Sequence, residues 1–589
     1  MLNNGDEGIT TDLKFDDLAG PNVIGIGNFH KTLPHNKFGE VDPAAYEAFR
    51  LAATANGDYE TVPPGFKGVV IPPEAGFAPT ITAIPHVSDR FNNPLSARNV
   101  DRITGAPTDF MMPPAPGVRS ISTAAEMTEL QWMAWLRDLP FADFSSSVDV
   151  ASAITELSTR FDSAQATGEL DGLQLIRDLP TKNNALDLRL NTLFRCGLPG
   201  EDIGPIISQF FLHDIAYGAQ FITQVVRPYR KDRDFLTNHG DWLRAQNAGL
   251  DEWGHGYAND NDFDFDPGFE ELVNGKVTMR HISTMRDLAR FVNKDALHQA
   301  YFNAALLCLN WKIPMGPGLP YGTYGRQAPF ATFGGPDVLT RVSEVASRAL
   351  SIVWRQKWEI HRRLRPEAYG GLMQMQRKGF GSIKRAYGLP EEVFTSVVTG
   401  KLTGKHNGDY FLPIAFSAGS PPHPSYGAGH ATVAGACVTV LKAWFDGTTR
   451  LEKHLADVRA HSPSTNYPND PVKISEPDAA GALIRYANPS VSAQITVEGE
   501  LNKIACNVAM GRSMGGVHFR SDNTRSLRLG EQIAAEIIRL ESLGYNERRK
   551  PDNSSPFWTF RSFNGNRVKI FDGSVYVENV KVDPKVGPL

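Results

Sequence analysis

Helical periodicity is the feature that most constrains this chain. From Ala124 onward, successive segments carry apolar residues three and four positions apart, the spacing that places them on one face of an α-helix. The expected helices lie within 124–139, 151–161, 184–197, 204–224, 285–311, 334–365, 492–512 and 526–544. The sequence therefore predicts a mainly α protein, built as a helical bundle around a common core.

The two ends of the chain follow other patterns. Residues 1–123 are rich in proline and glycine, which favours an irregular region that wraps over the core. The tail, 546–589, contains two short apolar runs on either side of "DGS", which predicts a β-hairpin. We therefore expect three parts, with the helical domain spanning 124–545 between the wrap and the tail.

Charge and hydropathy exclude several classes of protein. The formal net charge is −5 and the pI is about 6.3, so the chain has no general attraction to nucleic acid or anionic membranes. No apolar run reaches the roughly 18–20 residues of a membrane span. The first residues lack a signal-peptide pattern, which leaves the cytoplasm or export by another route open. An anion site, if present, requires a local group of basic residues.

Cysteines and acidic residues offer two weaker metal signals. The four cysteines, at 196, 308, 437 and 506, have no paired spacing, so we expect buried free thiols. One loop gathers Asp260, Asp262, Asp264 and Asp266. Calcium could bind such carboxylates, but the loop lacks the glycine and terminal glutamate of an EF-hand, and a solvated acidic loop is the alternative.

Three other segments combine basic residues and histidine. Lys357 and Arg365 lie eight residues apart, about 12 Å along a helix, so both side chains could reach one anion. Gly429 and His430 follow a turn of small residues where a helix is expected to start, and such a start presents free N–H groups to an anion. Each segment alone also fits a plainer structural role, as a solvated helix end or a tightly packed turn.

The third segment contains Arg512, His518 and Asp522. Arginine binds oxyanions through its planar fork of donors. Aspartate one helical turn after a histidine can accept one ring N–H and leave the other nitrogen basic. A surface salt-bridge network is the alternative for this segment alone, but all three segments together fit a tetrahedral oxyanion with one histidine bonded to its central atom.

These segments resemble the superfamily that joins vanadium-dependent haloperoxidases to histidine acid phosphatases of the lipid-phosphatase type. Its signature has Lys before Arg-Pro, then Pro-Ser-Gly-His, then Ser-Arg followed by His and Asp. The corresponding residues here are Lys357, Arg365-Pro366, Gly427-Ala428-Gly429-His430, Gly511-Arg512, His518 and Asp522. The likeness covers roughly 300–545, and "HPSYGAGHAT" looks most like the algal and cyanobacterial bromoperoxidase branch.

The resemblance implies vanadate as cofactor, with phosphate able to take the same site in its absence. It implies that His518 is the axial vanadium ligand and that His430 transfers protons. Lys357, Arg365, Arg512 and the Gly429 N–H are implied to bind the vanadate oxygens. Lys357 would also polarise bound peroxide, and Asp522 would hold His518 in the ligating tautomer.

The implied reaction is oxidation of a halide by hydrogen peroxide to hypohalous acid, which halogenates a small organic acceptor. His423 resembles the algal bromoperoxidases at a halide-pocket position, whereas Trp354 resembles the fungal chloroperoxidases. We therefore expect bromide and iodide as substrates, with chloride as a further candidate. The family also suggests a homo-oligomer.

Ala428 is the departure that matters most. The family serine donates a hydrogen bond to a vanadate oxygen, and alanine cannot. Such a bond is worth about 1.5–3 kcal/mol, so vanadate binding is expected to weaken about ten- to a hundredfold unless water or Ser425 replaces the donor. Two alternatives remain open from the sequence: an acid phosphatase with His518 as nucleophile, and a homologue that has lost vanadate.

Overall fold

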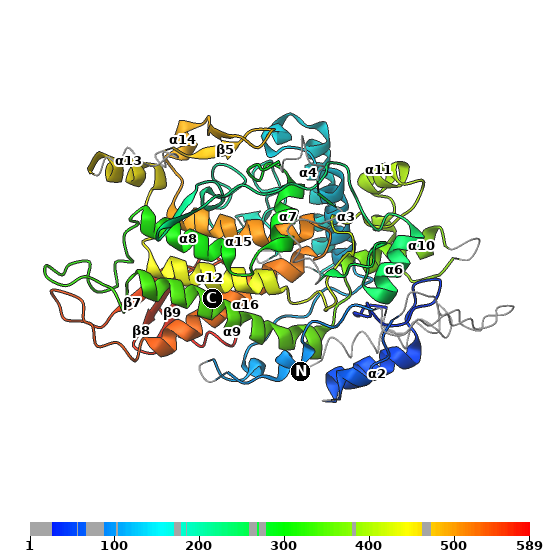
Figure 1. The fold of residues 1–589 in the computed structure, drawn as a ribbon, viewed down its shortest axis with the longest axis horizontal. Helices are drawn as coiled ribbons and strands as arrows, with labels where there is room; N and C mark the ends of the chain where they lie inside the picture. The colour runs from blue at the N-terminus through cyan, green and yellow to red at the C-terminus, as the bar shows by residue number, and fades with distance from the viewer. Residues whose placement is uncertain are drawn as a thin grey trace.

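The computed structural model describes residues 26–55, 57–65, 88–101, 104–169, 178–183, 185–257, 268–269, 278–379, 384–461 and 473–589. The acidic loop with Asp260, Asp262, Asp264 and Asp266 lies outside these residues. Four long helices form the centre of the molecule: α12 (Gly429–Trp444) lies between α9 (Gly335–Arg355), α15 (Val497–Met514) and α16 (Arg520–Glu541) (Figure 1). The prediction of a mainly α bundle is confirmed.

Other helices cover this centre. The α-helices are α2 (Pro43–Thr54), α3 (Ile121–Trp135), α4 (Val148–Ala166), α6 (His239–Ala248), α7 (Met285–Lys294), α8 (Gln299–Asn310), α10 (Pro366–Arg377), α11 (Val397–Lys405), α13 (Leu451–His461) and α14 (Pro489–Ser492). Short 3₁₀ turns are η1 (Tyr59–Thr61), η2 (Pro94–Arg98), η3 (Pro107–Asp109), η4 (Phe141–Ser146), η5 (Gln209–Phe211) and η8 (Glu391–Val393).

Close packing of α12 on α16 depends on two glycines. A Cβ on Gly435 would lie 2.0 Å from the carbonyl oxygen of Leu527, and one on Gly530 would lie 2.0 Å from that of Thr432. Each glycine therefore lets the backbone of the other helix approach. This contact sets the relative position of the N-terminal ends of the two helices, which carry site residues.

Helix α9 ends in a way that the periodicity does not predict. Its predicted apolar stripe is buried as expected at Val342, Val345, Ala349, Ile352 and Val353. The helix then widens into a π-helical turn, η7 (Gln356–His361), and the chain leaves it through a left-handed residue at 362. As a result Lys357 and Arg365 do not share one helix, contrary to the prediction.

Two predicted helices are wrong. Segment 184–197 forms turns after the short strands β1 (Thr181–Lys182) and β2 (Ala185–Leu186), and 204–224 forms η5 and a hairpin of β3 (Ile215–Tyr217) and β4 (Gln220–Ile222). In 204–224, η5 packs on α15 and α8 and β3 packs on α8, so tertiary contact overrides the helical spacing there. The predicted helix 285–311 is two helices, α7 and α8, separated at Asp295.

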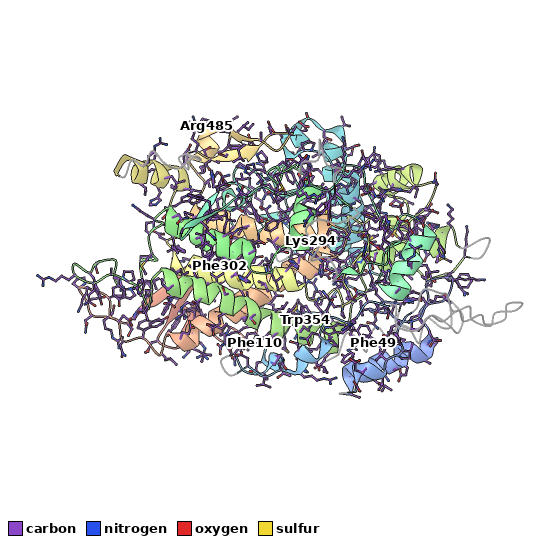
Figure 2. The ribbon with its side chains drawn as sticks, viewed as in Figure 1. Phe49, Phe110, Lys294, Phe302, Trp354 and Arg485 are labelled. Carbon is purple, nitrogen blue, oxygen red and sulfur yellow. The ribbon has the colours of Figure 1, made fainter. Side chains whose placement is uncertain are left out.

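The N-terminal region adds a second hydrophobic cluster. Phe29, Phe49 and Tyr59 pack around Trp358 of η7, with Trp354 beside them. Figure 2 shows Phe49 and Trp354 on the same lower side of the molecule. The backbone N–H of Phe29 donates to the carbonyl oxygen of Arg362 at 2.6 Å, so the wrap pairs directly with the segment before Arg365.

The C-terminal hairpin is confirmed and is part of a larger sheet. Strands β7 (Phe557–Arg561), β8 (Arg567–Phe571), β9 (Ser574–Val577) and β10 (Val580–Val582) form an antiparallel sheet in sequence order, with the "DGS" turn between β8 and β9. It packs on α12 and α16. A further hairpin joins β5 (Ser475–Pro477) to β6 (Leu483–Arg485).

All four cysteines are buried and free, as predicted. Among the described helices, none combines the length and apolar character of a membrane span.

We expect Gly435→Ala to destabilise the protein by about 3 kcal/mol or more, because the new methyl would overlap a backbone oxygen that cannot move alone. The measurement is the denaturant midpoint of unfolding. Gly400→Ala in α11 is the matched control: its Cβ meets no atom within 4 Å. It should stabilise by roughly 0.5–1 kcal/mol through helix propensity. Equal effects of the two substitutions would contradict this account of the helix contact.

Candidate oxyanion site

Five segments bring the predicted site residues together. Lys357 lies in η7, Arg365 directly precedes α10, and Gly429 and His430 open α12. Arg512 lies in the last turn of α15, and His518 and Asp522 lie at the start of α16. The convergence expected from the three sequence segments is therefore present in the fold.

Lys357 is fully buried. Its Nζ donates to the carbonyl oxygens of Pro424, at 2.7 Å, and Ser425, at 3.4 Å, and lies 5.5 Å from the ring centroid of Trp354. Burial, and then the nearby Arg365, hold the pKa of this amine well below its usual range. The lysine therefore has acceptors but no countercharge in contact.

Arg365 connects two histidines. Its guanidinium donates to the His518 Nε2 at 2.9 Å, the His423 Nδ1 at 2.8 Å, and the carbonyl oxygens of His423 and Val517 at 2.9 and 2.7 Å. Burial and the like charge of Arg512 lower the pKa of Arg365 to about 9.

Arg512 closes the other side of the site. One of its terminal nitrogens donates to the carbonyl oxygen of Val292 at 2.7 Å, and its Nε is buried without a hydrogen-bond partner. The guanidinium carbon lies 5.6 and 5.7 Å from the ring centroids of Tyr257 and Phe416. Aromatic rings thus cover part of this guanidinium without neutralising its charge.

Asp522 orients the ring of His518 through its Nδ1. The His518 Nδ1 lies 3.1 Å from the Asp522 Oδ2, and the same carboxylate accepts the backbone N–H of Phe519 at 2.9 Å. With Nδ1 protonated toward the carboxylate, Nε2 is the basic nitrogen that faces Arg365. Burial and the charges of Arg365 and Lys357 hold the pKa of His518 well below its usual range, so the imidazole is neutral.

A buried ion-pair network holds Asp522 in turn. Arg363 donates to Asp522 at 2.7 Å and to Glu126 of α3 at 2.9 Å, and Glu126 also accepts the backbone N–H of Ser521 at 2.6 Å. The guanidinium of Arg363 lies over the ring of Phe519 at 4.1 Å. Helix α3 is thereby tied to the segment that carries His518.

His430 faces the site from the first turn of α12. Its Nε2 lies 3.0 Å from the Asp295 Oδ1, between α7 and α8. Burial, followed by Arg512 among the cations, lowers the pKa of His430, and Asp295 opposes that shift. Its side chain keeps about 21% of its surface exposed, more than the other cationic or histidine side chains at the site centre, so it has the solvent access that proton transfer needs.

His423 and Trp354 lie side by side at the edge of the site. Their ring centroids are 5.3 Å apart, and the Trp354 indole N–H donates to the carbonyl oxygen of Asn92 at 2.9 Å. Burial and the charges of Lys357 and Arg365 hold the pKa of His423 well below its usual range. The two residues suggested by the sequence as a halide pocket thus lie next to each other and next to the cations.

The small-residue turn starts α12 as predicted, with Ala428 at its N-cap. No side chain caps this helix end, and the Ala428 backbone N–H is already bound to the Ser526 hydroxyl at 2.8 Å. A Cβ on Gly429 would lie 3.1 Å from Leu350 and 3.2 Å from Trp354. A larger residue at this position would therefore crowd both side chains.

Ser425 does not take over the role of the missing serine hydroxyl. Its hydroxyl makes a short hydrogen bond to the Asp522 Oδ2, on the side of His518 opposite to Nε2. It therefore reinforces the orientation of His518. Of the two replacements suggested by the sequence, only water remains.

The charge balance of the site is unusual within this protein. Of the lysines that the structure describes, four are buried, and Lys31, Lys442 and Lys503 each form an ion pair with a glutamate. In the described part of the chain, no carboxylate lies within 4.0 Å of the charged nitrogens of Lys357, Arg365 or Arg512. Burying unpaired charge is costly, so an anion between these three groups would remove a large penalty.

Some site residues carry no sequence signal. Asp295 is simply the residue after a helix, and Ser526 is an ordinary serine in a helix. Ser425 was expected, with water as the alternative, to act as a vanadate donor, and its contact with Asp522 was not foreseen. Arg363 lies in a run of basic residues next to the motif arginine, which made it indistinguishable from a solvated neighbour. Only the meeting of distant segments reveals their contacts.

Comparison with known proteins places this site in a family. The family model for the VCPO second helical-bundle domain matches residues 342–543. A vanadium-dependent bromoperoxidase from Corallina pilulifera is 32% identical over 601 residues, which cover 92% of this chain and 91% of the relative. One from Ascophyllum nodosum is 30% identical, with 94% and 88% covered.

A solved structure agrees with the sequence comparisons. The homohexameric structure of the second vanadate-dependent bromoperoxidase from Ascophyllum nodosum superposes with a TM-score of 0.77 at 25% identity, covering 98% of this chain and 91% of that one. The resemblance to the vanadium-dependent haloperoxidases, inferred from three motif segments, is confirmed. The chain belongs to the vanadium-dependent bromoperoxidase family of enzymes.

We expect Lys357→Met to stabilise the anion-free protein by roughly 1–3 kcal/mol, because it removes a buried charge without a countercharge. Since the pKa of Lys357 is lowered by folding, the penalty is full below the folded pKa and is lost as pH rises toward the ordinary lysine value. The gain from the substitution should therefore shrink with rising pH. Denaturant unfolding at several pH values measures it.

Lys442→Met is the matched control. It removes the partner of buried Glu531 and should destabilise by about 3–5 kcal/mol. Destabilisation by both substitutions to the same extent would show that Lys357 is already neutralised without an anion.

Proposed function

We propose that this protein binds vanadate between Lys357, Arg365, Arg512 and His518 and uses hydrogen peroxide to oxidise bromide. The observation that carries the proposal is the trio of buried cations, without carboxylate partners among the described residues, around the basic nitrogen of a neutral histidine. Vanadate would supply oxygens for the cations and a central atom for one nitrogen ligand. The donor set therefore fits this group.

The roles of the individual residues follow from their contacts. His518 is the vanadium ligand through Nε2, because Asp522 occupies its Nδ1. Lys357, Arg365, Arg512 and the N–H of Gly429 are the donors to the vanadate oxygens. When bound, vanadate acts as a Lewis acid that activates peroxide without changing its oxidation state.

Proton transfer falls to His430. Its ring lies at the entrance to α12 next to Arg512, its Nε2 is held by Asp295, and it is partly exposed. It can therefore accept a proton from incoming peroxide and pass it to solvent. Lys357 can polarise the peroxide oxygen while it is charged. Because its pKa is depressed, it can then release its own proton.

The halide is bound at the edge formed by His423 and Trp354. The adjacent charges of Lys357 and Arg365 attract an anion to this edge, and the two rings exclude part of the water. We propose bromide and iodide as substrates and chloride as a weaker one, with hypohalous acid reacting onward with a small organic acceptor.

Further partners follow from the same chemistry and from the relatives. Phosphate, which has the shape and charge of vanadate, is proposed to occupy the site when vanadate is absent. Since a relative is homohexameric, we propose that this chain also forms a homo-oligomer. Calcium at the acidic loop remains a sequence-based proposal, as does the division into 1–123, 124–545 and 546–589.

Vanadate-dependent bromination tests the proposed function. The purified chain, depleted of vanadate and then reconstituted with orthovanadate, should brominate a phenol in the presence of bromide and peroxide. His518→Ala should lose at least about a hundredfold in vanadate affinity because the nitrogen ligand is gone, whereas His454→Ala, a substitution in α13, should leave affinity unchanged. Absence of activity with any halide at saturating vanadate would sink the proposal.

The same preparation distinguishes the acid phosphatase alternative. The site would be assigned to phosphoryl transfer if the vanadate-free protein hydrolyses a phosphomonoester, if His518→Ala loses that activity, and if no halide is oxidised. Measurement of bound vanadium per chain separates both from a homologue that has lost vanadate.

Ala428→Ser should restore the missing donor. We expect vanadate to bind about ten- to a hundredfold more tightly, as one hydrogen bond to a charged group contributes about 1.5–3 kcal/mol. The measurement is a vanadate titration followed by bromination rate. Ser425→Ala is the informative comparison: its hydroxyl contacts Asp522, so it should weaken His518 orientation without removing a vanadate donor. No change in affinity on Ala428→Ser would mean that water already fills this place.

A further inference from the structure

Two of the four cysteines meet a buried glutamate far from the oxyanion site. Cys196 lies in the irregular chain that replaces the predicted helix 184–197, and Cys506 lies in α15. One ligand atom each of Cys196, Cys506 and Glu201 lies within 4.8 Å of the other two, and all three residues are buried. They are separated by up to about three hundred residues of sequence, so the contact is purely tertiary.

Glu201 is held in place by two backbone donors. Its Oε1 accepts the backbone N–H groups of Gly197 and Leu198, the latter at 2.9 Å. Its Oε2 is buried, and the polar group beside it is the Cys506 thiol. A metal ion that replaced the thiol proton would therefore lie between a fixed carboxylate and a sulfur ligand.

The charges around the cluster favour a divalent cation. Arg195 is buried, donates to the carbonyl oxygen of Ile206 at 3.0 Å, and interacts electrostatically with Glu201. The other nearby cations, Lys503 and Arg520, already have carboxylate partners. The charges of the Glu201 carboxylate and the Arg195 guanidinium thus cancel. Exchange of the two thiol protons for one divalent ion leaves this balance unchanged, so the ion can enter without adding net buried charge.

We infer that Cys196, Cys506 and Glu201 form a structural zinc site. Two thiolates and one carboxylate are ligands that zinc accepts in proteins, and hard ions such as calcium and magnesium avoid thiolates. Ligand atoms around a tetrahedral zinc are about 3.5–3.8 Å apart, so the cluster needs to contract by no more than about 1 Å. A water would be the fourth ligand.

The site braces the helix that carries Arg512. The segment that follows Cys196 runs along α15: Asn502 donates to the carbonyl oxygen of Pro199 at 2.9 Å, and Lys503 to that of Ile203 at 2.8 Å. Arg512 is six residues, about 9 Å, beyond Cys506 on the same helix. Zinc would therefore cross-link this segment to α15 at a distance from the vanadate site and without a part in the reaction.

Zinc content of the full-length chain tests the inference. After expression in zinc-replete medium and exhaustive dialysis, we expect one zinc per chain by plasma mass spectrometry, with or without vanadate. Cys506→Ser and Glu201→Gln should retain less than about a tenth of it. Cys308→Ser, which changes a buried cysteine outside the cluster, is the matched control and should keep one zinc per chain.

Cobalt substitution of the unchanged protein makes the result independent of whether the variants fold. Bound Co²⁺ should produce a thiolate charge-transfer absorption that zinc displaces. Three results would each overturn the inference. The first is zinc-free protein that shows no such absorption with Co²⁺, and the second is full zinc retention in Cys506→Ser. The third is a disulfide that leaves only two of the four thiols titratable after unfolding. None of these outcomes bears on vanadate-dependent bromination, so the two proposals fail separately.

Discussion

Burial of three like charges around one histidine is the constraint on which the rest of this structure depends. Lys357, Arg365 and Arg512 are desolvated without carboxylate partners among the described residues, so the three charges repel one another in the anion-free site. Packing of the surrounding hydrophobic core supplies the free energy that offsets this repulsion. An anion of high charge, once bound, turns a destabilising cluster into a stabilising one, which couples cofactor binding to stability.

The scaffold around the site is organised to keep that cluster rigid. Asp522 receives hydrogen bonds or ion pairs from His518, Ser425, Arg363 and the helix start of α16. Glycine contacts let α12 and α16 approach closely, and the N-terminal wrap pairs with the segment before Arg365. Segments far apart in sequence thus share one network, and contacts from several of them orient the ring of His518.

Prediction from the sequence succeeded where chemistry is local and failed where it is not. The motif residues carry their meaning in residue type and spacing, so Lys357, Arg365, His430, Arg512 and His518 could be proposed without coordinates. Apolar spacing was misleading at 184–197 and 204–224, because turns and short strands bury the same residues. The contacts of Ser425 with Asp522 and of Asp295 with His430 were beyond reach, since each partner lies about a hundred residues away or more.

The sequence by itself determined the helical character and the family, and it put forward candidate oxyanion-binding side chains, because periodicity and motif chemistry are properties of neighbouring residues. Only the tertiary structure decided which of the described cations lack a carboxylate partner, that Asp522 contacts the His518 Nδ1, and that Cys196 meets Cys506 beside Glu201. Burial and charge balance depend on what distant segments place around a group. No local pattern records them.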